Sequence, residues 1–206
     1  MTSAIASLSL GYLLGCINPA KMISRRKNTN LEEFGTKNLG ATNTMLAFGM
    51  RYGVFVMVFD ILKGFLSVKL AKWLFPKLAL AGIFAGCGAV IGHIYPYYLH
   101  FRGGKGLAAF GGMVLAVDPV LFLLLLSIGV ALGFLTDYAE ALPISAALLF
   151  PLFTLLHTWD WAAFWLLLGI GVLIVHKHRE NLRKICSGEA IRLSAYWKSK
   201  RRKDEA

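Results

Sequence analysis

Long apolar stretches alternate with short polar segments along most of the chain. The apolar stretches lie near residues 4–24, 53–75, 78–99, 107–118, 119–136, 141–158 and 160–176. A helix needs about 20 mostly apolar residues to cross a hydrocarbon core of roughly 30 Å. The pattern therefore predicts an all-α integral membrane protein with about seven transmembrane helices. Because the fourth stretch is short and only Asp118-Pro119 separates it from the fifth, five or six crossings are the alternatives.

Composition supports the membrane class and narrows the chemistry. Hydrophobic residues make up 57% of the 206 positions and charged residues 16%, with a mean hydropathy of +0.61, which is too apolar for an ordinary soluble domain. We therefore expect one transmembrane domain over residues 1–206, with no separate soluble part. Cys16, Cys87 and Cys186 are scattered and lack the spacing of a disulfide framework or metal site. No metal and no cofactor are expected.

The positions of the cations predict the orientation, because short loops rich in Lys and Arg stay in the cytoplasm. Cations occur in the first long loop, in the loop at Arg102 and Lys105, and in the basic tail 177–206. With seven crossings these regions share one side, so the amino terminus is outside and the carboxyl terminus is cytoplasmic. The net charge of +11 is then explained by contact with anionic lipid, for instance at Lys198–Lys203, and nucleic acid is not expected as a partner.

A first polar segment runs from Gly35 to Asn43 on the predicted cytoplasmic side. Its glycines, threonines and asparagines supply hydroxyls, amides and accessible backbone N–H groups, which can cradle an anion. The residues concerned are Thr36, Lys37, Asn38, Gly40, Thr42 and Asn43. The alternative is an ordinary polar turn with a helix N-cap.

A second polar segment, Arg102-Gly103-Gly104-Lys105-Gly106, immediately precedes an apolar stretch. A glycine turn that opens a helix directs N–H groups and the positive end of the helix dipole toward a bound anion, and Lys105 adds a full charge. We interpret the segment as a phosphate site, although it lacks Walker A spacing and a basic turn at the membrane surface is the alternative.

A third polar segment, from His176 to Asn181, follows the last apolar stretch. His178 and Asn181 are three residues apart, so on a continuous helix they share a face and could contact one ligand together. The alternative is a solvated helix at the membrane surface.

Two further polar positions lie inside apolar stretches. Asp60 and Lys63 are spaced to neutralise each other, and we interpret them as a structural pair. His93 is interpreted as a packing histidine with its polar atoms satisfied.

In order and spacing, these residues resemble a known family, the bacterial membrane acyltransferases that move a fatty acyl group from acyl phosphate to glycerol 3-phosphate. The resemblance covers about residues 15–189. Its most specific part is Gly92-His93-Ile94-Tyr95-Pro96 continuing through 101–106. The other matching segments are 15–20, 38–43, 60–64 and 178–181.

The resemblance implies a small seven-helix enzyme of the bacterial cytoplasmic membrane that makes 1-acyl-glycerol 3-phosphate for phospholipid synthesis. It places Lys105, His178 and Asn181 in the active site, and Thr36 where the family usually has serine. The expected partners are acyl phosphate, glycerol 3-phosphate and membrane lipid, and a monomer is compatible with this interpretation.

Two residues depart from the family pattern. Lys37 replaces a usual glycine, and Leu46 stands where an arginine is expected to contact the substrate phosphate. Leucine cannot replace a charge-assisted contact, so we hypothesise that Lys37 or Arg51 supplies the missing charge. The departures leave open a different phosphorylated acceptor or an inactive paralogue.

The chemistry of the donor favours direct transfer. Acyl phosphate is an activated mixed anhydride, so the enzyme has little need of a covalent acyl intermediate. We expect Lys105, Gly103, Gly104 and Gly106 to bind phosphate and Thr36, Asn38 and Asn43 to position substrate. His178 or a substrate phosphate oxygen would accept the proton. A small lipid or anion transporter is the alternative outside the enzymes, disfavoured because the polar residues gather at one face.

Overall fold

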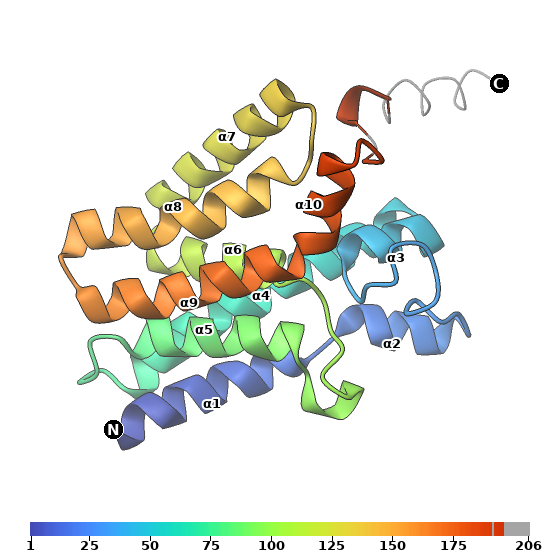
Figure 1. Cartoon of the computed structure of the whole chain (residues 1–206). Coiled ribbons are helices and arrows are strands. Elements are labelled where there is room, and N and C mark those ends of the chain that lie inside the picture. The colour runs from blue at the N-terminus through green and yellow to red at the C-terminus, as the bar shows by residue number, and fades with distance from the viewer. Residues whose placement is uncertain (191, 196–206) are drawn as a thin grey trace. The chain divides into compact units, whose positions relative to one another are not determined.

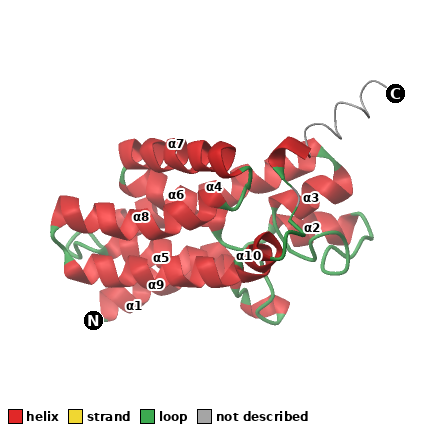
Figure 2. Cartoon of the chain, turned by 45° about the horizontal axis from the view of Figure 1, so that its top comes forward, coloured by secondary structure: helices red, strands yellow, loops and turns green. Residues whose placement is uncertain are grey.

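The computed structural model describes residues 1–190 and 192–195, and the predicted lipid contact at Lys198–Lys203 lies outside them. The chain divides into two compact units, one from Met1 to Pro119 and one beginning at Val120. Figure 2 shows helices joined by loops, and the described residues contain no β-strand. The all-α prediction is confirmed.

The first unit contains six α-helices and one short 3-10 helix (Figure 1). They are α1 Thr2–Cys16, α2 Pro19–Arg26, α3 Ala41–Phe48, α4 Met50–Leu74, α5 Ala81–Ile94, η1 Tyr97–Leu99 and α6 Leu107–Val117.

Close backbone contact between α1 and α5 holds this unit together, and Figure 1 shows the two helices side by side. A Cβ at Gly11 would lie 1.8 Å from the carbonyl oxygen of Ala85, and one at Gly88 would lie 2.2 Å from that of Leu8. Small residues spaced by four let membrane helices approach this closely. The glycines of the apolar stretches therefore act as packing surfaces.

The first predicted apolar stretch is a broken helix. α1 ends at Cys16, and α2 begins at Pro19 after Asn18, whose backbone is extended and whose Oδ1 accepts a hydrogen bond from the Lys21 N–H at 2.9 Å. Proline disfavours the helical conformation of the residue before it, while proline itself suits the first helical position. The break at Ile17 leaves a backbone carbonyl available to another partner.

The second unit contains α7 Pro119–Thr136, whose first residue belongs to the first unit, α8 Ala141–Thr158, α9 Trp161–Lys177 and α10 Arg179–Cys186. α8 packs beside α9. Asp118 adopts an extended conformation between α6 and α7, so the Asp118-Pro119 break separates two helices.

Every predicted apolar stretch contains a helix, but their lengths differ. Three segments are long and apolar enough to cross a membrane, namely Thr2–Arg26, Pro119–Thr136 and Ala141–Thr158, and α9 with α10 adds a fourth if that pair, bent by 54°, is one span. α5 has 14 residues and α6 has 11, fewer than the roughly 20 that a straight crossing needs. The count of seven crossings thus stays a prediction.

Candidate active site

The first polar segment is held in shape by Asn43 on α3. This side chain is fully buried, and its Nδ2 donates to the carbonyl oxygens of Leu31 at 2.8 Å and Asn38 at 3.0 Å, while its Oδ1 accepts from the Thr36 N–H at 2.9 Å. Three of the four hydrogen bonds that an amide can make are therefore used on the loop itself. The structure gives Asn43 the role of fixing the loop.

The other residues of this segment differ in exposure. Thr36, Lys37 and Thr42 are exposed, Asn38 is half-buried, and Gly40 is buried at the N-cap of α3. Since Asn43 fixes the backbone beneath them, the exposed side chains project from a defined surface.

Lys37 adopts a left-handed backbone conformation with φ of +53°. Glycine adopts this conformation without strain, whereas a residue with a Cβ pays roughly 1–2 kcal/mol. The structure thus gives a physical reason for the usual glycine at this position. Leu46 is 50% exposed on α3, and Arg51 is exposed at the start of α4.

An apolar cluster underlies the same loop. Leu31 and Leu39 from the loop are buried with Ala20 of α2 and Val56 of α4. The Asn18 side chain, 2% exposed, adds a 3.4 Å hydrogen bond to the Leu39 carbonyl. The loop is therefore packed onto the helices.

The second polar segment is clamped onto the end of α5. The N–H of Gly103 donates to the Ile94 carbonyl and that of Gly104 to the His93 carbonyl, both at 3.0 Å. A Cβ at Gly104 would lie 2.0 Å from His93 Nε2. These two glycines thus permit close packing, and their N–H groups are already used in this structure.

Lys105 and Gly106 follow this clamp and lead into α6. Lys105 is half-buried, and Gly106 has φ of +92° as the N-cap of α6. The first N–H groups of a helix have no partner within the helix, and the positive end of its dipole lies there. Lys105 and the first turn of α6 therefore form the part of this loop best suited to an anion.

A buried ionic cluster supports the clamp from below. Lys63 Nζ lies 2.7 Å from Asp60 Oδ1, which confirms the predicted pair, and His93 Nδ1 lies 3.2 Å from the same oxygen. Lys63 also donates to the carbonyl of Ile17 at the α1–α2 break, at 2.8 Å. The prediction that His93 is a satisfied packing residue is confirmed. The sequence could also have indicated that His93 has a polar partner, since a buried imidazole requires one.

The third polar segment lies at the bend between α9 and α10 in the second unit. His178 is 4% exposed, and its Nδ1 lies 2.8 Å from the Ile174 carbonyl, which can only accept, so Nδ1 carries a hydrogen. Nε2 lies 3.8 Å from Glu140 Oε2, and Asn181 Nδ2 donates to Glu140 Oε1 at 2.5 Å. His178 and Asn181 therefore meet one side chain, despite the bend in the helix.

Glu140 was not predicted from the sequence. It belongs to the turn between α7 and α8, 38 positions before His178 in the numbering, and nothing in the local pattern pairs it with the third segment. Thr36 and Lys105 belong to the first unit and His178 and Asn181 to the second.

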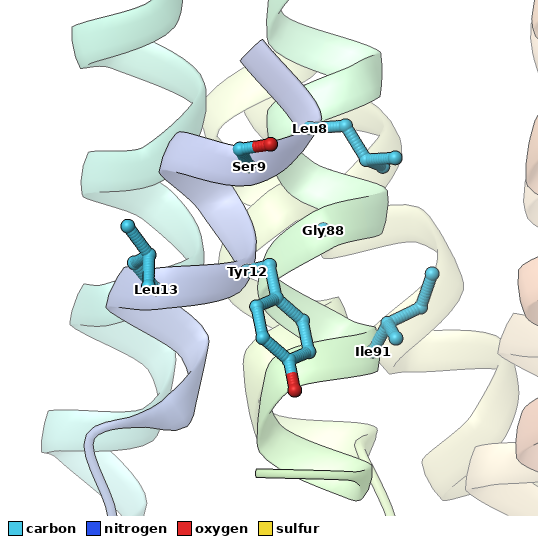
Figure 3. Close-up of a pocket in the computed structure, with 6 residues that line it drawn as sticks. All are labelled: Leu8, Ser9, Tyr12, Leu13, Gly88 and Ile91. Atoms are coloured by element: carbon cyan, nitrogen blue, oxygen red, sulfur yellow. The ribbon is translucent and has the colours of Figure 1, made fainter. Parts of the chain in front are cut away.

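An apolar groove of about 310 Å³ lies on α1 and α5 (Figure 3). It is lined by Leu8, Ser9, Tyr12, Leu13, Gly88 and Ile91. The Tyr12 hydroxyl donates to the carbonyl of Tyr95, at 2.9 Å, just beyond the end of α5. Within the described residues, no group of three or more His, Cys, Asp and Glu side chains could hold a metal ion.

Comparison with known proteins places this geometry in context. The family model described as "Glycerol-3-phosphate acyltransferase" matches residues 5–188. A protein of that name from Aquifex aeolicus is 35% identical over 191 residues, which cover 92% of this chain and 98% of that protein. "Glycerol-3-phosphate acyltransferase 1" of Deinococcus radiodurans is 38% identical over 197 residues, covering 93% and 96% of the two chains.

Solved structures give the same result. A crystal structure described as PlsY, an integral membrane glycerol 3-phosphate acyltransferase in its glycerol 3-phosphate form, superposes with a TM-score of 0.84 at 33% identity. The match covers 92% of this chain and 95% of that one. The lysophosphatidic acid form of the same protein gives a TM-score of 0.81 over the same shares.

Proposed function

Since the chain belongs to the glycerol-3-phosphate acyltransferase family, we propose how this membrane-embedded enzyme carries out acyl transfer. The reaction moves a fatty acyl group to glycerol 3-phosphate and yields 1-acyl-glycerol 3-phosphate, which is lysophosphatidate. The observation that carries the assignment is the match, over 92% of the chain, to a structure of such an enzyme described in its glycerol 3-phosphate form.

The proposed donor is acyl phosphate, and the proposed setting is the bacterial cytoplasmic membrane. We place seven crossings in one domain, the amino terminus outside, and the site on the cytoplasmic face of a monomer. In support, cations occur in the first long loop, in the loop at 102–106 and in the segment at 176–181, and short basic loops stay in the cytoplasm.

In the proposed function each of the three polar segments has its own part. Lys105 and the first turn of α6 hold a phosphate group, and Thr36, Lys37, Asn38, Gly40 and Thr42 line the acceptor side. Asn43 acts by fixing that loop. The packing of Gly103, Gly104 and Gly106 on α5 fixes the position of Lys105. The enzyme has to bring two anions together despite their repulsion, so cations and a fixed geometry are its main contribution.

The proposed reaction is a direct displacement. The hydroxyl of glycerol 3-phosphate attacks the acyl carbonyl carbon, a new ester C–O bond forms, and the C–O bond to phosphate breaks as inorganic phosphate leaves. His178 Nε2 or an oxygen of the departing phosphate takes the hydroxyl proton. In the neutral ring Nε2 is the only nitrogen able to accept it, because Nδ1 already carries a hydrogen for the Ile174 carbonyl.

The test is to incubate the purified protein and glycerol 3-phosphate with acyl phosphate, acyl-CoA or acyl carrier protein in parallel. We expect lysophosphatidate only with acyl phosphate. Lys105→Ala should abolish turnover while the protein remains folded in detergent. Lys77→Ala, at an exposed lysine of the α4–α5 loop, is the matched control and should retain activity. Product from acyl-CoA alone would overturn the donor assignment, and near-normal activity of Lys105→Ala would remove that residue from the site.

A further inference from the structure

The Glu140 side chain contacts both His178 and Asn181. Its Oε1 accepts a 2.5 Å hydrogen bond from Asn181 Nδ2, and its Oε2 lies 3.8 Å from His178 Nε2. The shorter distance corresponds to a hydrogen bond. The longer distance is too long for a hydrogen bond but within the range of an ion pair. The carboxylate therefore orients the amide directly and acts on the imidazole through its charge.

The imidazole is fixed from its other side. The side chain of His178 is 5% exposed, and its Nδ1 is tied to the Ile174 carbonyl at 2.8 Å. The ring therefore lies between a carbonyl and a carboxylate, both of which favour a hydrogen on the nitrogen facing them. An imidazolium formed when Nε2 takes a proton would thus be stabilised on both nitrogens.

A negative charge at this place has an evident cost. A site that binds a phosphate-bearing substrate loses affinity when a carboxylate lies near it. Glu140 is also 79% removed from solvent, its side chain being 21% exposed, so water screens it incompletely. Glu140 disfavours anion binding, yet it contacts two side chains that are assigned to the reacting centre. A role in the reaction step explains why a carboxylate is present there.

We propose that Glu140 is a positioning residue for acyl transfer, holding Asn181 by a hydrogen bond and orienting the imidazole of His178 by the charge of its carboxylate. This inference rests on the proposed function, because the two side chains that Glu140 contacts are those assigned to the reacting centre. Glu140 acts through them and need not touch the substrate.

Two substitutions separate the two contacts. Glu140→Gln keeps an oxygen that can accept from Asn181 but removes the charge facing His178. We expect kcat to fall about tenfold to a hundredfold, the usual range for a misdirected catalytic group. The KM for glycerol 3-phosphate should stay unchanged or fall, because a negative charge near its phosphate is removed. Glu140→Ala removes both contacts and should lower kcat further and raise KM.

Asp137 provides the matched control on the same turn. Its carboxylate accepts from the Ser194 N–H at 2.9 Å and the Ser194 hydroxyl at 2.6 Å, so it binds the segment after α10. Asp137→Asn should leave kcat and KM within about twofold of wild type, an ordinary result for a surface change. Equal losses in Asp137→Asn and Glu140→Gln would reduce Glu140 to a general support of the turn and overturn the proposal.

A double-mutant cycle tests the contact without using activity. Glu140→Ala, Asn181→Ala and the double variant are compared by thermal unfolding in detergent. We expect the two changes to be non-additive, because each removes the same hydrogen bond. Additive shifts would overturn the contact, and coupled shifts with wild-type kinetics in Glu140→Gln would overturn the role in catalysis. If the wild-type enzyme makes no lysophosphatidate from any donor, the proposed function and the kinetic part of the inference both fail, and the cycle still decides the contact.

Discussion

Replacing Gly104 by alanine tests the idea that the second polar loop positions Lys105 through its packing on α5. The added Cβ would lie 2.0 Å from His93 Nε2, against about 3.5 Å for an ordinary non-bonded contact, so one group must move by roughly 1.5 Å. The imidazole cannot easily yield, because His93 Nδ1 lies 3.2 Å from Asp60 Oδ1 and Asp60 is paired with Lys63 at 2.7 Å. We therefore expect the loop to move.

The magnitude follows from what the loop carries. Moving it strains the 3.0 Å hydrogen bond from the Gly104 N–H to the His93 carbonyl and shifts Lys105, the next residue. Misplacing a catalytic group by about 1 Å costs on the order of a hundredfold in rate, equivalent to about 2.7 kcal/mol of transition-state stabilisation. Overpacking a close contact costs about 1–3 kcal/mol in stability. We expect kcat/KM to fall about a hundredfold while a folded protein is still recovered in detergent.

The assay is lysophosphatidate formation from acyl phosphate, with thermal unfolding measured on the same preparation. Gly169→Ala is the matched control, because nothing lies within 4 Å of a Cβ at this position of α9. It should change neither activity nor melting temperature appreciably. Wild-type kinetics in Gly104→Ala would refute the reasoning, since a loop that absorbs a methyl group there does not set the position of Lys105.

Three further predictions concern the first unit. Lys63→Met leaves Asp60 buried without its ammonium partner and should lower the free energy of unfolding by about 3–5 kcal/mol, while Asp60→Asn combined with Lys63→Met should unfold closer to wild type, as thermal unfolding in detergent will show. Lys37→Gly should raise the KM for glycerol 3-phosphate if Lys37 supplies the missing charge, and should raise the melting temperature slightly by relieving the left-handed backbone at φ of +53°; an unchanged KM excludes Lys37 as the substitute. Asn43→Leu removes three hydrogen bonds to the loop and should speed proteolysis between residues 27 and 40, whereas Thr42→Ala, at an exposed neighbour, should not; equal protection in both variants would show that Asn43 does not fix the loop.

Hydrophobic patterning determined much of this protein in advance. Each predicted apolar stretch contains a helix, because burial in lipid rewards backbone that satisfies its own hydrogen bonds. The Asp60–Lys63 ion pair could also be predicted, since residues three apart on a helix are neighbours and charges inside an apolar stretch require a partner. The hydrophobic pattern did not reveal the helix break at Asn18-Pro19. Hydropathy is averaged over the whole stretch, whereas a proline disfavours the helical conformation of the single residue before it.

The tertiary structure alone decided how the polar residues are used. A glycine-rich segment predicts accessible N–H groups, yet those of Gly103 and Gly104 are taken by carbonyls at the end of α5, a result that depends on where two segments meet. The sequence led us to expect that Asn43 positions substrate, whereas in the structure its side chain fixes its own loop. The sequence around Glu140 does not indicate its role, because α8 and α9 separate it along the chain from the two residues that it contacts. Periodicity is a property of neighbours along the chain, whereas a hydrogen bond between distant residues exists only once the helices between them have packed.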